Sequence, residues 1–175
     1  MRTAAAAEAA MRHLAELGHR EAAHLSGPKA SWAAGERRRA FHRMSGAAGV
    51  VLHDVATQVP TFEAAVDAVD ALLASGATAI TAFNDQMALG VIAGLARRGV
   101  RVPEDVSVIG CDDVPMAAMV SPALTTIRMP VEEAGSVAIE VLQAGSGQVE
   151  LLGTFVVRDS TGRVNDSARR VGRGR

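Results

Sequence analysis

Aromatic side chains are scarce in this sequence. They make up 3% of its 175 residues, with no Tyr and a single Trp, whereas hydrophobic residues together make up 49%. A core can therefore be filled only by Ala, Val, Leu, Ile and Met, and much of it by alanine, which lets helices pack closely. The length and composition are typical of one globular domain.

Cysteine and long apolar runs are scarce as well. Cys111 is the only cysteine, which excludes an intramolecular disulfide and a thiolate metal cluster and is typical of a reducing compartment. The longest uncharged stretch, residues 71–84, is interrupted by Ser75 and Gly76 and is shorter than the ~18 residues of a membrane span. The N-terminal residues form an alanine-rich amphipathic helix rather than a signal peptide. We therefore expect a cytoplasmic protein with no membrane partner.

Neither sign of charge dominates. Eighteen basic residues face 19 acidic ones, which gives a net charge of −1, so the chain as a whole is not expected to be drawn to nucleic acid. The one asymmetry is residues 159–175, where five Arg and two Asp give 5 − 2 = +3. We expect residues 161–175 to form a disordered basic tail.

Helix and strand patterns alternate along most of the chain. Apolar residues at intervals of three and four predict helices, and short apolar runs between turn residues predict strands. In chain order the pattern predicts helix 3–17, strand 21–25, helix 31–44, strand 49–53, helix 61–74, strand 77–83, helix 85–98, strand 106–110, strand 124–128, helix 130–144 and strand 151–158. This alternation is typical of an α/β fold, a doubly wound parallel sheet covered by helices on both faces.

Polar side chains follow three of the predicted strands at the point where each strand ends. In open α/β sheets, ligands bind beyond the carboxyl ends of the strands. Carboxylates and amides make hydrogen bonds in fixed directions, and an arginine offers a planar fork of donors, so such a set suits a small polyol. The residues are Ser31 and Arg37 after strand 21–25, Asn84 and Asp85 after strand 77–83, and Asp112 and Asp113 after strand 106–110.

A local structural role explains some of the same residues. Asn84 stands where a helix N-cap is expected, and Asp112 and Asp113 are residue types that stabilise turns. The spacing of these residues leaves both interpretations open.

The motifs of common enzyme classes are missing. The five histidines show no metal-ligand spacing, and the sequence has no Gly-x-Ser-x-Gly elbow, no phosphate-binding loop and no dinucleotide-binding glycine motif. Cys111 precedes two aspartates, which raise the pKa of a thiol and disfavour a reactive thiolate. These observations argue against an enzyme on this type of sheet, and we expect no enzyme activity, no metal and no cofactor.

Several strings of residues match a known family. They are residues 83–90 (FNDQMALG), residues 99–110 (GVRVPEDVSVIG) with Asp112 and Asp113, Ser121-Pro122, residues 124–127 (LTTI), residues 17–20 (LGHR), Gly27-Pro28, and Arg37 before Phe41. In this order they resemble the C-terminal part of the effector-binding domain of LacI/GalR transcription regulators. The resemblance covers about residues 6–162.

The resemblance implies a fold and a partner. The fold would be periplasmic-binding-protein-like, type I, with an incomplete N-terminal lobe. Residues 1–160 would be a partial sensor domain, with residues 1–76 mostly in the N-terminal lobe and residues 77–128 mostly in the C-terminal lobe. The domain would form a homodimer, bind a small sugar or nucleoside between its lobes and relay that binding to a DNA-binding headpiece.

The resemblance also implies roles for individual residues. Arg37 and Asn84 would bond ligand hydroxyl groups, Asp112 would do the same from the other lobe, and Ser31 is a further match nearby. The sequence departs from the family at Cys111, where an aromatic residue is common, and at Met129, where a polar residue is common. The loop over residues 46–60 also looks shortened. These departures put the sugar specificity in question.

The helix-turn-helix of the family has no match in this sequence. We therefore expect DNA binding only through a headpiece that these residues lack. Missing strands predict an exposed apolar edge and self-association. For the homodimer that the resemblance implies, residues 84–98 and residues 130–144 are the candidate interfaces. Two alternatives stay open: a truncated remnant without independent activity, and a transport-type solute-binding protein, which would need an export signal.

Overall fold

One six-stranded sheet organises the computed structural model, which describes residues 3–144 and 151–165. The strands lie in the order β2-β1-β3-β4-β5-β6, and the first five are parallel. Their bounds are Glu21–Ser26 (β1), Val51–Ala56 (β2), Ala79–Ala82 (β3), Ser107–Asp112 (β4), Thr125–Arg128 (β5) and Thr154–Val156 (β6). The predicted α/β fold with a mainly parallel sheet is confirmed.

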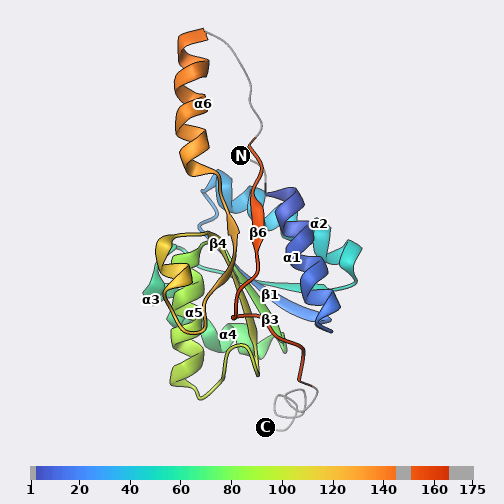
Figure 1. Ribbon diagram of the computed structural model, residues 1–175. Coiled ribbons are helices and arrows are strands. Elements are labelled where there is room, and N and C mark those ends of the chain that lie inside the picture. The colour runs from blue at the N-terminus through green and yellow to red at the C-terminus, as the bar shows by residue number, and fades with distance from the viewer. Residues whose placement is uncertain (1–2, 145–150, 166–175) are drawn as a thin grey trace.

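Helices cover both faces of the sheet (Figure 1). Helices α1 (Ala4–Glu16) and α2 (Trp32–Ala48) lie on one face, and α3 (Phe62–Asp67), α4 (Val69–Ala74) and α5 (Asp85–Arg97) lie on the other. A short 3-10 helix, η1 (Pro115–Ala118), follows β4, and α6 (Val131–Ala144) follows β5. None of the described helices combines the length and the hydropathy required of a membrane span.

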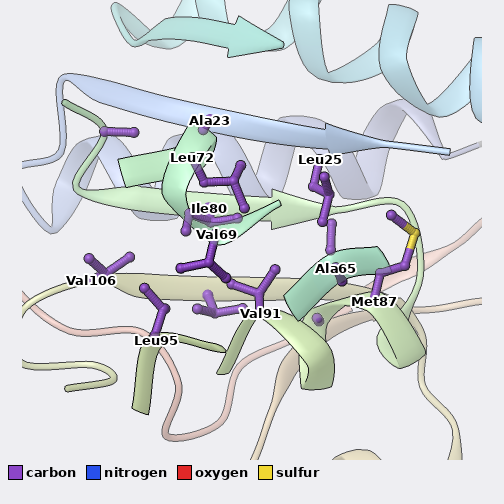
Figure 2. Close-up of a cluster of buried hydrophobic side chains, with 14 of the residues drawn as sticks. Ala23, Leu25, Ala65, Val69, Leu72, Ile80, Met87, Val91, Leu95 and Val106 are labelled. Carbon is purple, nitrogen blue, oxygen red and sulfur yellow. The ribbon is translucent and has the colours of Figure 1, made fainter. Parts of the chain in front are cut away.

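Each face of the sheet has its own apolar core. On the face of α3, α4 and α5, Ile80 of the sheet packs among Val69, Val91 and Leu95 of the helices (Figure 2). On the face of α1 and α2, the fully buried Phe41 packs among alanines, Met11 and Leu14, and Phe155 packs against this core from β6. The cores are therefore built from aliphatic side chains, as the composition predicted.

Two glycines let α5 approach α3 and α4 closely. A Cβ at Gly90 would overlap with the carbonyl oxygen of Phe62, and a Cβ at Gly94 would lie 2.6 Å from Val69 Cγ2. Backbone atoms cannot move aside as a flexible side chain can, so residue 90 must be a glycine for the two helices to keep this distance.

Some element boundaries differ from the prediction for local reasons. Helix α2 continues through Gly46 and ends at Gly49, whose φ of +69° is left-handed and allows the hydrogen bonds that close the helix. The strand expected from residue 49 therefore begins at Val51. The single helix expected over residues 61–74 is broken into α3 and α4 at Ala68, where no proline or glycine marks the break.

The sheet is not parallel throughout, because β6 runs antiparallel to β5. In a parallel pair the connecting helix packs back onto the sheet. Helix α6, which connects β5 and β6, instead projects away from the sheet, and none of the other described elements packs closely against it (Figure 1). The strand predicted over residues 151–158 is observed as β6, which covers only Thr154–Val156 and runs antiparallel to β5.

The described part of the C-terminal segment is held in place, which differs from the expectation of a tail beginning at residue 161. Thr161 hydrogen-bonds to His13, Gly162 accepts from His19, and the Val164 N–H donates to Leu17. Residues 166–175, the rest of the expected tail, lie outside the described residues.

The lobe boundary expected near residue 76 does not coincide with a break in the sheet. Strand β1, expected in the N-terminal lobe, pairs along its length with β3, expected in the C-terminal lobe. Periodicity in the sequence identifies strands but not their neighbours, so this pairing could not be predicted from the pattern.

We predict opposite effects for two glycine-to-alanine substitutions in helices. Gly90→Ala is expected to lower the free energy of unfolding by about 1–3 kcal/mol, because the added methyl group meets backbone. Gly46→Ala, where nothing lies within 4 Å of the added atom, is expected to raise it by about 0.5–1 kcal/mol. Urea unfolding measures both, and an unchanged stability for Gly90→Ala would contradict the close helix packing.

Candidate functional site

The strand order locates the edge of the sheet where a ligand is expected. In a sheet of order 2-1-3-4-5, the order in which strands are added reverses between β1 and β3. Ligands bind beyond the carboxyl ends of the two strands at such a switch point. Gly27 follows β1 and Phe83 follows β3. A Cβ at Gly27 would lie 2.7 Å from the Phe83 ring, so the glycine lets the ring come close at this point.

Arg37 reaches this edge from helix α2. It lies on the same face of the helix as the buried residues Ala34 and Phe41, so its side chain is directed inward and is only 13% exposed. Its Nη1 donates a hydrogen bond to the carbonyl oxygen of Phe83 at 2.6 Å, and its Nη2 donates to Oδ1 of Asp112 at 2.6 Å. The guanidinium group also lies over the Phe83 ring, with Cζ 4.8 Å from the ring centroid.

Asp112 ends β4 beside this guanidinium group. Its side chain is 33% exposed, so the ion pair with Arg37 is partly open to solvent. Burial raises the pKa of Asp112 above the ordinary value, and the charge and hydrogen bond of Arg37 oppose that rise. The structure therefore brings together two of the predicted site residues as a charged pair with an accessible acceptor.

The other two predicted residues have structural roles. Asn84 caps α5, because its Oδ1 accepts the Met87 N–H at 2.9 Å, and Ser31 caps α2 by accepting the Ala34 N–H at 3.2 Å. The cap interpretation of Asn84 is confirmed. It leaves the amide N–H groups of Asn84 available, since no partner for them is found among the described residues. Asn84 directly follows Phe83, whereas Ser31 makes no direct hydrogen bond to the other three predicted residues.

Sequence reasoning missed the part that Phe83 plays at this edge and the burial of Asp85. Phe83 was seen only as the end of a strand, yet its carbonyl group and ring both contact Arg37. Asp85 stands among the polar residues that follow strand 77–83, yet the sequence did not show that it is completely buried. For this edge as a whole, the available signal in the sequence was Arg37, because its position on the apolar face of α2 predicts a charge directed into the protein.

The histidines pair within the protein. His42 contacts Asp54, His53 contacts Glu21, and His24 is buried against Thr81, so that burial lowers the pKa of His24 to about 4. Among the described residues, no group of three His, Cys, Asp or Glu side chains could hold a metal ion.

A family model of the periplasmic binding protein-like domain matches residues 11–161. The chain belongs to this family. More specific similarities point to one type of member. The HTH-type transcriptional repressor PurR of Vibrio cholerae is 39% identical over 137 residues, which are 76% of this chain, and that of Vibrio vulnificus is 35% identical over 167 residues, 89% of this chain.

Solved structures agree with this assignment. A LacI family transcriptional regulator from Enterococcus faecium with bound ribose has a TM-score of 0.79 and 29% identity over 91% of this chain. A dimeric Lac repressor has a TM-score of 0.82 and 28% identity over 91% of this chain. The chain is a LacI/GalR effector-binding domain, as its strings of residues predicted. It spans 41% and 50% of the two PurR relatives and 63% and 61% of these two structures.

Cys111 lies beside the site but is predicted to be unreactive. Burial raises the pKa of its thiol to about 12; Arg37 opposes the rise and Asp112 adds to it. The direction expected from the sequence is confirmed, although burial is the main cause. At pH 8 the native chain should hold roughly a thousandfold less thiolate than an unfolded cysteine with a pKa of about 8.5. Iodoacetamide should therefore label Cys111 rapidly in urea and very slowly in buffer, whereas rapid labelling in buffer would contradict this environment.

Proposed function

We propose that this domain binds a small polyhydroxylated effector, a sugar or a nucleoside, at the carboxyl edge of its sheet. The observation that carries the proposal is the Arg37–Asp112 pair at this edge, because it presents a carboxylate acceptor and an arginine donor side by side. Vicinal hydroxyl groups both donate and accept, so a sugar can bond to both groups at once.

Each site residue has a proposed part in binding. The partly exposed carboxylate of Asp112 accepts hydrogen bonds from ligand hydroxyl groups, and Arg37 donates to a ligand oxygen. Asn84 uses its free amide N–H groups as a further donor, while its Oδ1 keeps the cap of α5. Ser31 contributes by fixing the start of α2 and thereby the position of Arg37.

Binding controls a conformation and involves no reaction step. A ligand that prefers one arrangement of the protein shifts the population toward it by its difference in affinity. In a cytoplasmic regulator as long as the PurR relatives, that shift would change operator binding by a helix-turn-helix headpiece, which we expect outside these residues. The ribose bound in the Enterococcus faecium structure supports a sugar-type effector. The similarity to transcriptional repressors supports a role other than catalysis.

Thermal unfolding tests the proposed binding. We expect D-ribose, inosine or a related compound from a millimolar panel to raise the Tm of the 175-residue chain, because a ligand bound only by the folded state adds about 2.7 kcal/mol at 100 times its Kd. Asp112→Asn and Arg37→Lys are expected to abolish the increase. Asp105→Asn is the matched control, since it removes a partly exposed carboxylate that is likewise paired with an arginine, Arg101, but at the opposite edge of the sheet.

The outcomes separate this proposal from its alternatives. An increase in Tm that persists in Asp112→Asn would place binding elsewhere. A chain that shows no cooperative transition would favour a remnant without independent activity. A well-folded chain that responds to no sugar or nucleoside would contradict the proposed effector class.

We further propose that the chain self-associates as a homodimer through α6. Val131, Ile139 and Leu142 on this helix are exposed. A 14-residue helix that no other described element packs closely against is marginally stable in water. The other interface expected from the sequence, residues 84–98, is less suited because the apolar side chains of α5 face the core. The Lac repressor structure is dimeric, which supports association in this family.

Sedimentation velocity at micromolar concentration tests the dimer. We expect the wild-type chain to sediment as a dimer and the double variant Ile139→Lys, Leu142→Lys to sediment as a monomer, because two buried lysines would oppose the contact. Met119→Lys, which replaces an equally exposed methionine beyond η1, should leave the dimer intact. A monomeric wild-type chain, or a double variant that still dimerises, would rule out α6 as the interface.

A further inference from the structure

The backbone around Asp112 adopts a conformation that side chains rarely tolerate. The φ angles of Asp112 and Asp113 are +124° and +60°, and both residues carry a Cβ. Such angles cost of order 1–3 kcal/mol per residue and persist only where surrounding contacts hold them. The chain must turn here, between the end of β4 and η1, and the turn sets the direction in which Asp112 faces Arg37.

We propose that Asp85 and Asp113 are positioning residues that hold residues 112–114 in the conformation that directs the Asp112 carboxylate at Arg37. Neither of them contacts Arg37 directly through a hydrogen bond among the described residues. They act on the backbone on the C-terminal side of Asp112. Their importance for ligand binding rests on the proposed function, whereas their effect on the Arg37–Asp112 pair does not.

Asp113 is fixed by two arginines, one from β5 and one from the segment after β6. Its Oδ2 accepts from Arg128 Nε at 2.6 Å, and its Oδ1 accepts from Arg158 Nη2 at 2.6 Å. The side chain of Asp113 is only 7% exposed. Although burial raises the pKa of Asp113, the hydrogen bonds from Arg158 and Arg128 bring it below the ordinary value. Asp113 therefore stays charged and keeps its left-handed backbone tied to β5 and to the segment after β6.

Asp85 fixes the next residue from the inside. It is completely buried, its Oδ2 accepts the Val114 N–H at 2.9 Å, and its Oδ1 accepts the hydroxyl of Thr126. A Cβ at Gly110 would overlap with this carboxylate, so the sequence leaves space for it inside β4. Burial raises the pKa of Asp85, and the two hydrogen bonds oppose that rise.

The three aspartates thus have separate tasks. The carboxylate oxygens of Asp85 accept hydrogen bonds from Val114 and Thr126, and those of Asp113 accept from two arginines. These oxygens are therefore not proposed as ligand acceptors. Asp112 makes one ion pair, with Arg37, and remains partly exposed. Because Asp113 and Val114 are fixed, the carboxylate of Asp112 is kept in one orientation. A selective binding group requires this kind of preorganisation.

A double-mutant cycle tests the proposal without any ligand. Arg37→Met, Asp112→Asn and the double variant are compared by urea midpoint in the full chain, and the departure from additivity measures the coupling of the pair. We expect a clear coupling in the wild-type background and its loss in the Asp85→Ala background, where Val114 N–H loses its acceptor. Asp85→Asn should restore the coupling, because an amide oxygen can accept the same N–H.

A control separates positioning from general destabilisation. Ser160→Ala removes a completely buried hydroxyl that bonds to Val108 and Thr125, so it should lower every midpoint but leave the coupling intact. If Asp85→Ala does not fold, Asp113→Asn replaces it as the background, and loss of coupling is again expected. Coupling that is unchanged in the Asp85→Ala or Asp113→Asn background overturns the proposal.

Calorimetric titration with D-ribose adds the functional arm. If the wild-type chain binds ribose, Asp85→Ala should weaken binding by at least about tenfold, as expected when a hydrogen bond to a charged group is lost, and Ser160→Ala should not. If no ribose binds to the wild-type chain, the ribose form of the proposed function fails, while the double-mutant cycle still decides whether Asp85 and Asp113 position Asp112.

Discussion

The guanidinium group of Arg37 joins three parts of the chain that are far apart in sequence. It leaves α2, donates to the carbonyl group at the end of β3 and donates to the carboxylate at the end of β4. Because a guanidinium group is planar, its two hydrogen bonds fix the direction of both partners. The contact holds Arg37 and Asp112 beside the end of β3, and the turn at Asp112 and Asp113, where both φ angles are positive, is the segment that we propose to maintain it.

Local features of the fold could be predicted because their causes are local. Alternating helix and strand patterns gave an α/β fold with a mostly parallel sheet, and capping residues such as Ser31 and Asn84 marked helix starts that the structure has. The rule that ligands meet the carboxyl ends of strands then selected Arg37 and Asp112, which do form a pair. Strings shared with LacI/GalR regulators identified the family.

Other features depend on contacts between distant residues and carry no local signal. The pairing of β1 with β3 and the antiparallel direction of β6 both depend on strands that are far apart in sequence. Asp85 has the sequence context of a solvated helix start, and only the presence of Gly110 and Thr126 in neighbouring strands turns it into a buried acceptor. Tertiary packing, rather than propensity, decides each of these cases.

The most direct measurement is NMR mapping of ligand binding on the 15N-labelled chain, with D-ribose and inosine added in turn. The account predicts that amide shifts gather at the carboxyl edge of the sheet, at Arg37, Asn84 and the turn over residues 112–114, and that the amino edge around Ser107 and Ser160 stays unchanged. Shifts that gather at the amino edge or along α6, or a spectrum that no compound of this class changes, would contradict it.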